Sequence, residues 1–218
     1  MRSRSEIAEE IKSAVLVAVI RTPKAELVLP VCEALLAGGI SCLEITLTVP
    51  NALDAIRAVS KTLGSRALVG AGTVLDASAC RAAIAAGAEF VVSPITRLEI
   101  IGAAHALGKP VMIGAYTPTE AQTAHEAGAD FIKIFPADKL GPGYIKNLRA
   151  PLPHLQIVPT GGVDLQTAAE FLKVGCVALG VGSSLLSPEI LKTGNWPELT
   201  RLAAEFVRVV RETRRKGA

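Results

Sequence analysis

The sequence has few aromatic residues and few histidines, and it lacks the cysteine pairs of common metal and redox motifs. Aromatic residues make up 4% of the 218 residues, which argues against a nucleic-acid surface, where basic and aromatic side chains are interleaved. The four cysteines are far apart in apolar segments, so we expect buried, reduced thiols. The three histidines have no partner at the spacing of metal ligands, and we expect no metal.

Long apolar runs and nucleotide-binding motifs are also missing. The longest stretch without a charged residue, Val174 to Pro188, has 15 residues, fewer than the ~18 that suggest a membrane span. The N-terminal segment carries acidic residues before its apolar run and no small-residue cleavage site, so we expect a cytoplasmic protein with no membrane partner. We find no P-loop, no Gly-x-Ser-x-Gly elbow and no dinucleotide fingerprint, and we expect no cofactor.

The chain is instead rich in residues that form a core. Hydrophobic residues make up 50% of the sequence and the mean hydropathy is +0.42, values that exclude a disordered chain. The net charge is +3, and much of the basic excess lies near the C-terminus, where basic side chains are typical of a solvated helix end. The length fits one domain over residues 1–218.

Short apolar runs alternate with helical patterns along the whole chain. Their near-continuous apolar character is typical of parallel strands covered on both faces. Thr22-Pro23 predicts a helix start after the first run. The eight predicted strands are Val15 to Ile20, Cys42 to Thr46, Ala67 to Gly70, Phe90 to Val92, Val111 to Gly114, Phe131 to Phe135, Gln156 to Pro159 and Val177 to Val181.

A weak internal repeat supports a closed arrangement of these strands. Glycines at Gly38, Gly87, Gly128 and Gly175 each follow a helical pattern and precede a strand, which predicts left-handed helix stops. They recur about every two strand–helix units. With a further helix at about Glu6 to Lys12, the count predicts a (β/α)8 TIM barrel with an extra N-terminal helix, and an open doubly wound sheet is the alternative.

Two ionisable residues interrupt the apolar strands. Lys133 lies within Phe-Ile-Lys-Ile-Phe, where desolvation disfavours the ammonium form and leaves some neutral amine to attack a carbonyl and form a Schiff base. Glu44 interrupts another strand of the same barrel and can carry protons for that reaction. The structural alternatives are a lysine that extends to solvent and a buried pair that neutralises itself with little net stability.

Other polar residues follow the strands, at the end of the barrel where active sites are built. Arg21 can hold a carboxylate by two parallel hydrogen bonds, or form a surface ion pair. Thr73 follows a glycine-rich segment and can bond a carboxylate or ketone oxygen. The segments after strands seven and eight, if they are not merely tight turns, predict a phosphate site; they contain Thr160, Gly161, Gly162, Gly182, Ser183 and Ser184.

Five motifs in unbroken order resemble one family. The match extends from about residue 15 to residue 185, and its most specific parts are Gly-Ala-Gly-Thr, Phe-x-Lys-x-Phe-Pro and Pro-Thr-Gly-Gly. The sequence is similar to 2-keto-3-deoxy-6-phosphogluconate (KDPG) aldolase, a family also labelled 4-hydroxy-2-oxoglutarate (KHG) aldolase. The motifs are Leu43-Glu44-Ile45-Thr46, Val69-Gly70-Ala71-Gly72-Thr73-Val74, Phe90-Val91-Val92-Ser93-Pro94, Phe131-Ile132-Lys133-Ile134-Phe135-Pro136-Ala137 and Pro159-Thr160-Gly161-Gly162-Val163.

The resemblance implies a metal-independent class I aldolase of carbohydrate metabolism that forms a homotrimer. Its substrate would be KDPG of the Entner-Doudoroff pathway, cleaved to pyruvate and glyceraldehyde 3-phosphate, with KHG, cleaved to pyruvate and glyoxylate, as a second substrate. By resemblance, Lys133 matches the Schiff-base lysine and Glu44 the general acid/base. The matched binding residues are Arg21 at the pyruvate carboxylate, Thr73 and Thr160 in the pyruvate pocket, Gly161, Gly162, Gly182, Ser183 and Ser184 at the phosphate, and Pro94 and Phe135 in the pocket wall.

The sequence differs from the resembled family at one substrate-binding position, and two alternative functions stay open. Thr48 stands where some members carry a substrate-binding arginine, which leaves the preference between KDPG and KHG open. No residue discriminates the gluconate from the galactonate epimer at C4. The alternatives are a phosphate-binding barrel isomerase or synthase that uses no covalent lysine, and a non-catalytic trimeric barrel that binds a metabolite.

Overall fold

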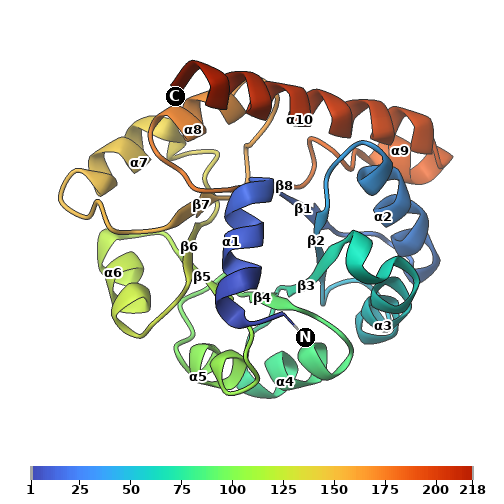
Figure 1. Ribbon diagram of the computed structural model, residues 1–218, viewed down its shortest axis with the longest axis horizontal. Helices are drawn as coiled ribbons and strands as arrows, with labels where there is room; N and C mark the ends of the chain where they lie inside the picture. The colour runs from blue at the N-terminus through green and yellow to red at the C-terminus, as the bar shows by residue number, and fades with distance from the viewer. Residues whose placement is uncertain (1, 218) are drawn as a thin grey trace.

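The computed structural model describes residues 2–217, and within them eight parallel strands form one sheet. The strands pair in the order β7-β6-β5-β4-β3-β2-β1-β8, and a bridge between Thr160 and Gly180 joins its two edges. The sheet therefore closes into a barrel, seen end-on in Figure 1. The strands are β1 (Leu16–Ile20), β2 (Cys42–Thr46), β3 (Leu68–Gly72), β4 (Phe90–Val92), β5 (Val111–Ala115), β6 (Phe131–Ile134), β7 (Ile157–Pro159) and β8 (Leu179–Val181).

Helices surround the barrel and confirm the predicted (β/α)8 fold with an extra N-terminal helix (Figure 1). The last helix packs against both α2 and α8, so it joins the final unit to the first. None of the helices in the described part of the chain has the length and apolar character needed to cross a membrane. The helices are α1 (Arg4–Ala14), η1 (Ala25–Leu27), α2 (Val28–Ala37), α3 (Ala52–Leu63), η2 (Gly64–Arg66), α4 (Ala77–Ala85), α5 (Glu99–His105), α6 (Pro118–Glu126), α7 (Gly141–Arg149), α8 (Ala168–Lys173), α9 (Pro188–Thr193) and α10 (Trp196–Gly217).

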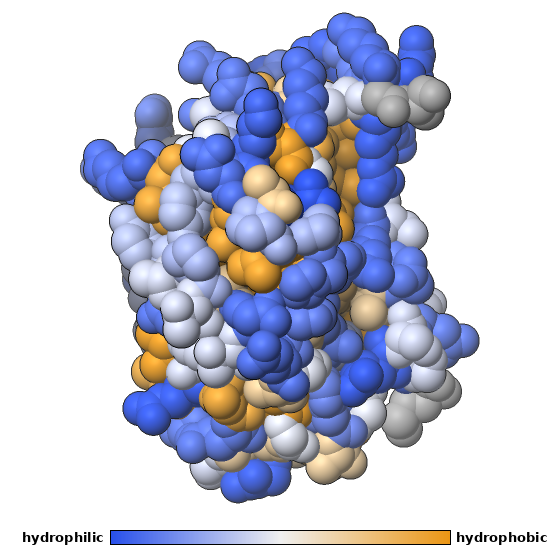
Figure 2. Space-filling view, turned by 90° about the vertical axis from the view of Figure 1, so that its left-hand side faces the viewer, coloured by the Kyte–Doolittle hydropathy of each residue, from blue (hydrophilic) through white to orange (hydrophobic). Residues whose placement is uncertain are grey.

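Alternation along the strands creates an outer and an inner apolar layer. In β2, Leu43 and Ile45 belong to the layer between the strands and the helices, whereas Cys42 belongs to the cluster inside the barrel. Successive side chains of a strand point to opposite faces, so Glu44 also faces the interior. The outer surface over α6 and α7 is mostly hydrophilic, with apolar side chains in patches between polar ones (Figure 2).

Helix α1 closes the amino-terminal end of the barrel, across which it lies in Figure 1. Its Ile7 and Ile11 are buried in the inner cluster, against side chains from the first residues of the strands. A capping box between Ser3 and Glu6 starts the helix. Arg214 of α10 donates hydrogen bonds to main-chain oxygens at the C-terminal end of α1. Helix α1 therefore covers the amino-terminal end of the barrel, and the cavity described below lies at the other end.

The predicted helix boundaries are wrong at two places near the start of the chain. Gly38 has φ −80°, and the positive φ falls on Gly39; Gly38 instead lies against α10, where a Cβ would overlap Ala203. No helix begins at Pro23, because the Thr22 hydroxyl donates to the Lys24 carbonyl instead of capping a turn. Helix α2 starts only at residue 28. The positive φ expected at the other three glycine stops is confirmed.

Candidate active site

Lys133 and Glu44 meet inside the barrel. Both face inward by strand alternation, and Lys133 pairs in register with Gly114 of β5. The Lys133 Nζ lies 3.5 Å from Glu44 Oε1, and the two residues are 4% and 1% exposed. Among the described residues, Glu44 Oε1 has no hydrogen-bond partner. A buried oxygen of this kind is costly to leave unpaired, so it is available to a ligand or to water.

Glycine on the neighbouring strand makes room for the Glu44 carboxylate. A Cβ added at Gly72 would overlap Oε1, Cδ and Cγ of Glu44. Gly70, two residues earlier on the same inward face, leaves space for the Phe90 ring in the same way. The Gly-x-Gly spacing in β3 therefore serves the packing of neighbouring side chains.

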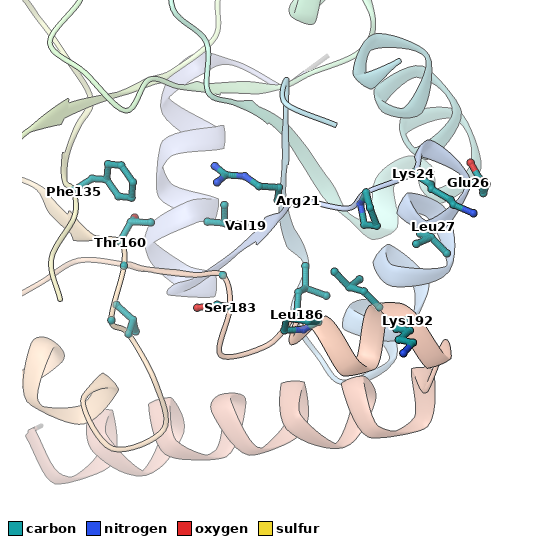
Figure 3. A pocket seen from close by; sticks show the side chains of 17 residues that line it. Val19, Arg21, Lys24, Glu26, Leu27, Phe135, Thr160, Ser183, Leu186 and Lys192 are labelled. Carbon is teal, nitrogen blue, oxygen red and sulfur yellow. The ribbon is translucent and has the colours of Figure 1, made fainter. Parts of the chain in front are cut away.

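A cavity of about 850 Å³ opens at the carboxyl ends of the strands. It lies within the size range of small-molecule sites. In Figure 3 the Arg21 side chain extends along the cavity toward Phe135. Seven of the predicted site residues line it: Arg21, Phe135, Thr160, Gly161, Gly162, Gly182 and Ser183.

Phe135 connects this cavity to the buried pair. It lies two residues after Lys133, on the same inward face and nearer the mouth of the barrel, and the Lys133 Nζ is 5.4 Å from the centre of its ring. The same ring also lines a smaller cavity of about 330 Å³, whose wall includes Pro94. Phe135 is therefore the residue shared by the cavity lining and the surroundings of the Lys133 amine.

Five other predicted residues lie outside the lining of the large cavity: Lys133, Glu44, Thr73, Pro94 and Ser184. Thr73 is half-buried, and its φ of 57° is unusual for a residue with a Cβ. Ser184 is half-buried in the turn after β8. Thr48, which stands where some members of the resembled family carry an arginine, has an exposed side chain. Its hydroxyl oxygen lies 2.9 Å from the hydroxyl oxygen of Thr46.

The glycines after β7 have a conformational reason to be glycine. Gly161 and Gly162 have φ of 88° and 72°, values that L side chains rarely adopt. A Cβ at Gly162 would also overlap Asp138. The segment after β8 forms a turn in which the Leu185 and Leu186 amides both donate to the Gly182 carbonyl. These two turns bring backbone groups to one side of the cavity.

The sequence did not predict the charged residues at the other side. Lys24 and Glu26, between β1 and α2, line the large cavity together with Lys192 of α9. Their positions depend on the late start of α2 and on α9, neither of which was predicted. No local pattern indicated them, since Thr22-Pro23 has the residue types of a helix start and Lys192 lies beyond the turn after β8.

Nothing in the described residues suggests a metal centre or a reactive thiol. No group of three or more His, Cys, Asp and Glu side chains between residues 2 and 217 could hold a metal ion. All four cysteines are free and buried. Burial raises the pKa of Cys32, Cys42 and Cys176 to about 12, so the thiolate nucleophile is scarce at neutral pH. The chemistry available here is that of an amine and a carboxylate.

Comparison with known proteins gives one consistent result. The family model described as KDPG and KHG aldolase matches residues 7–202. The 2-dehydro-3-deoxy-6-phosphogalactonate aldolase of Escherichia coli K12 is 37% identical over 90% of this chain and 95% of its own length. The 2-dehydro-3-deoxy-phosphogluconate aldolase of Pseudomonas aeruginosa PAO1 is 36% identical over 86% of each chain.

A solved structure agrees with these relatives. KDPG aldolase from Legionella pneumophila, with pyruvate captured at low pH as a covalent carbinolamine intermediate, superimposes with a TM-score of 0.84 at 30% identity. The match covers 91% of this chain and 96% of that one.

Proposed function

The chain belongs to the KDPG and KHG aldolase family, and we propose that it is a class I aldolase that cleaves KDPG to pyruvate and glyceraldehyde 3-phosphate. KHG, which yields pyruvate and glyoxylate, is the proposed second substrate. Membership of an aldolase family makes the chain a lyase. The covalent mechanism and the choice of substrate are our proposal.

The observation that carries the proposal is the buried pair of Lys133 and Glu44. An amine 3.5 Å from a carboxylate inside a barrel has a proton acceptor at hand, and the ring of Phe135, 5.4 Å from that amine, lines the large cavity. A mere structural pair would gain little, since buried ion pairs contribute little net stability compared with apolar replacements. The Legionella relative, with its covalent carbinolamine of pyruvate, supports the same chemistry.

The proposed reaction begins when the neutral amine of Lys133 attacks the C2 ketone carbon. Glu44 carries the protons that convert the carbinolamine oxygen into a leaving water. The resulting iminium accepts the electron pair of the C3–C4 bond as that bond breaks and the C4 hydroxyl loses its proton. Glyceraldehyde 3-phosphate then leaves, and the enamine of pyruvate remains on the lysine.

The second half returns the enzyme to its starting state. Carbon C3 of the enamine takes a proton, and water adds to C2 of the iminium and releases pyruvate with the free amine. One water is lost in the first half and one is consumed in the second, so the balance is that of a simple cleavage. Glu44 is the proton carrier in both halves.

The remaining residues are proposed to hold the substrate. Arg21 binds the carboxylate, and Thr73 and Thr160 bond oxygens near C1 and C2. The backbone turns after β7 and β8 hold the phosphate, because glycines let amide groups approach an anion. The proposed phosphate residues are Gly161, Gly162, Gly182, Ser183 and Ser184, and Pro94 and Phe135 shape the wall beside the amine.

Reductive trapping tests the covalent step. Treatment with pyruvate and borohydride should add one reduced pyruvyl group, and peptide mapping should assign it to Lys133. Lys133→Met should abolish the adduct, whereas Lys109→Met, which alters the other buried lysine, should retain it. An unchanged mass, under conditions where a known class I aldolase reacts, would contradict the mechanism and favour a barrel isomerase or synthase.

Turnover assays test the substrate. Released pyruvate, coupled to lactate dehydrogenase, should appear with KDPG, and kcat/KM should be compared with that for the galactonate epimer and for KHG. The two relatives named for the two epimers are almost equally similar to this chain, so this comparison decides between them. Pyruvate binding without turnover would instead indicate a non-catalytic metabolite-binding barrel.

We also propose that the chain forms a homotrimer and acts in the cytoplasm, as the family resemblance implies. Light scattering of the purified protein should give three times the mass of one chain. A mass of one chain at micromolar concentration would refute the trimer.

A further inference from the structure

The far end of the large cavity carries more positive charge than the sequence predicted. Lys24 and Lys192 line it along with one carboxylate, Glu26. Figure 3 places these three side chains at the end remote from Phe135, while Arg21 extends toward that ring. The cavity therefore has an inner end at Phe135 and an outer end with two lysines.

The outer lysines are not engaged within the protein. In residues 2–217, neither the Lys24 nor the Lys192 ammonium lies within 4.0 Å of a carboxylate, and both residues are exposed. Glu26 forms no ion pair in this part of the chain either. These charges are therefore free to act on whatever enters the cavity.

The length of the substrate connects the two ends. In the proposed adduct, an acid bonded through C2 to Lys133 would extend the rest of its chain toward the cavity that Phe135 lines. In KDPG that chain ends in a dianionic phosphate, whereas KHG is shorter and ends in a single carboxylate. A cation within a cavity attracts the dianion more strongly than the monoanion, because the Coulomb energy scales with the charge.

We propose that Lys24 and Lys192 are specificity-determining residues that favour phosphorylated acids over KHG, and that Glu26 opposes them. This inference rests on the proposed aldolase function. The two lysines act by charge at the outer end of the cavity, in addition to the backbone turns after β7 and β8. They supply positive charge that Thr48, a neutral residue, does not.

A structural role for Lys192 makes a different prediction. It lies in the last turn of α9, where a cation also interacts favourably with the helix dipole. Loss of that interaction would affect all substrates alike. The ratio of kcat/KM for KDPG to kcat/KM for KHG therefore separates selection of the substrate from stabilisation of the helix.

The test measures this ratio in Lys24→Met, Lys192→Met and the double variant, with the lactate dehydrogenase assay. Each single change should lower kcat/KM for KDPG on the order of five- to tenfold, mainly through KM, and change the value for KHG by less than about twofold. Glu26→Gln should shift the ratio in the opposite direction. Lys61→Met, which removes an exposed lysine of α3 outside this cavity, should leave it unchanged.

The outcomes separate this inference from the function on which it rests. An unaltered ratio in the lysine variants, or an equal loss for both substrates, overturns the role of Lys24 and Lys192 while pyruvate release by the unmodified protein upholds the aldolase. Absence of pyruvate release by the unmodified protein overturns both. Added salt should reduce the preference for KDPG in the unmodified protein and have less effect in the double variant.

Discussion

Replacement of Gly72 by alanine should disturb the buried pair of Lys133 and Glu44 while both of these residues are left unchanged. Gly72 has no positive φ, so alanine can adopt its backbone conformation, and the effect is steric. The added Cβ would overlap the Glu44 carboxylate, which has to move because the surrounding core is closely packed.

The magnitude follows from the costs of overpacking and of losing a proton carrier. Overpacking of a core costs about 1–3 kcal/mol, and in a chain of this length each kcal/mol lowers Tm by about 2–4 °C. We therefore expect a fall in Tm of roughly 4–8 °C for a cost of about 2 kcal/mol. Displacement of Glu44 from Lys133 should lower kcat by on the order of 100-fold, the lower range for general acid–base catalysis.

Circular dichroism and the pyruvate assay measure the two effects. Gly102→Ala in α5 is the matched control, because a Cβ there meets nothing within 4 Å, and it should stabilise the helix by about 0.5–1 kcal/mol. Glu44→Ala should relieve the overlap, so the double variant with Gly72→Ala should be less destabilised than the sum of the single changes. A variant with unchanged Tm and kcat would refute this account of the glycine.

Three further predictions concern stability and reactivity. The amides of Tyr116 and Thr117 donate to the Glu120 carboxylate and lower its pKa. The contribution of Glu120 to the free energy of unfolding is therefore present above its pKa in the unfolded chain and is lost as pH falls through its lower pKa in the folded protein. The Glu120→Gln variant should accordingly show a smaller fall in Tm than the unmodified protein between about pH 6 and pH 3. Arg214→Ala should cost about 1 kcal/mol and speed hydrogen exchange in α1. Native protein at pH 8 should react slowly with iodoacetamide, and denatured protein fully, because burial raises the pKa of the thiols of Cys32, Cys42 and Cys176.

The architecture was predictable because it depends on patterns that repeat along the chain. Each apolar run reports one strand, the glycine stops recur about every two strand–helix units, and eight units favour closure. The inward direction of Lys133 and Glu44 also follows from the alternation within β6 and β2. Their separation of 3.5 Å does not, since it depends on strand stagger and on the space left by Gly72.

The outer end of the cavity was not predictable for a similar reason. Thr22-Pro23 has the residue types of a helix start, yet residue 24 is extended, with φ −143° and ψ 143°, and the helix begins later. A cap signature reports which residues can start a helix but not the path that a connection takes over the barrel. That path places Lys24 and Glu26 on the cavity wall, which no local pattern indicates.

Helix α1 covers the amino-terminal end of the barrel, so substrate and products are expected to pass through the carboxyl end. This constrains the order in which the products depart. In the proposed reaction, the aldehyde fragment would be released on the mouth side of the scissile bond, while the pyruvate fragment would stay bonded to Lys133 until water reaches it. Glyceraldehyde 3-phosphate should therefore exit first and pyruvate last. In product-inhibition kinetics, pyruvate should accordingly compete with the substrate for the free enzyme.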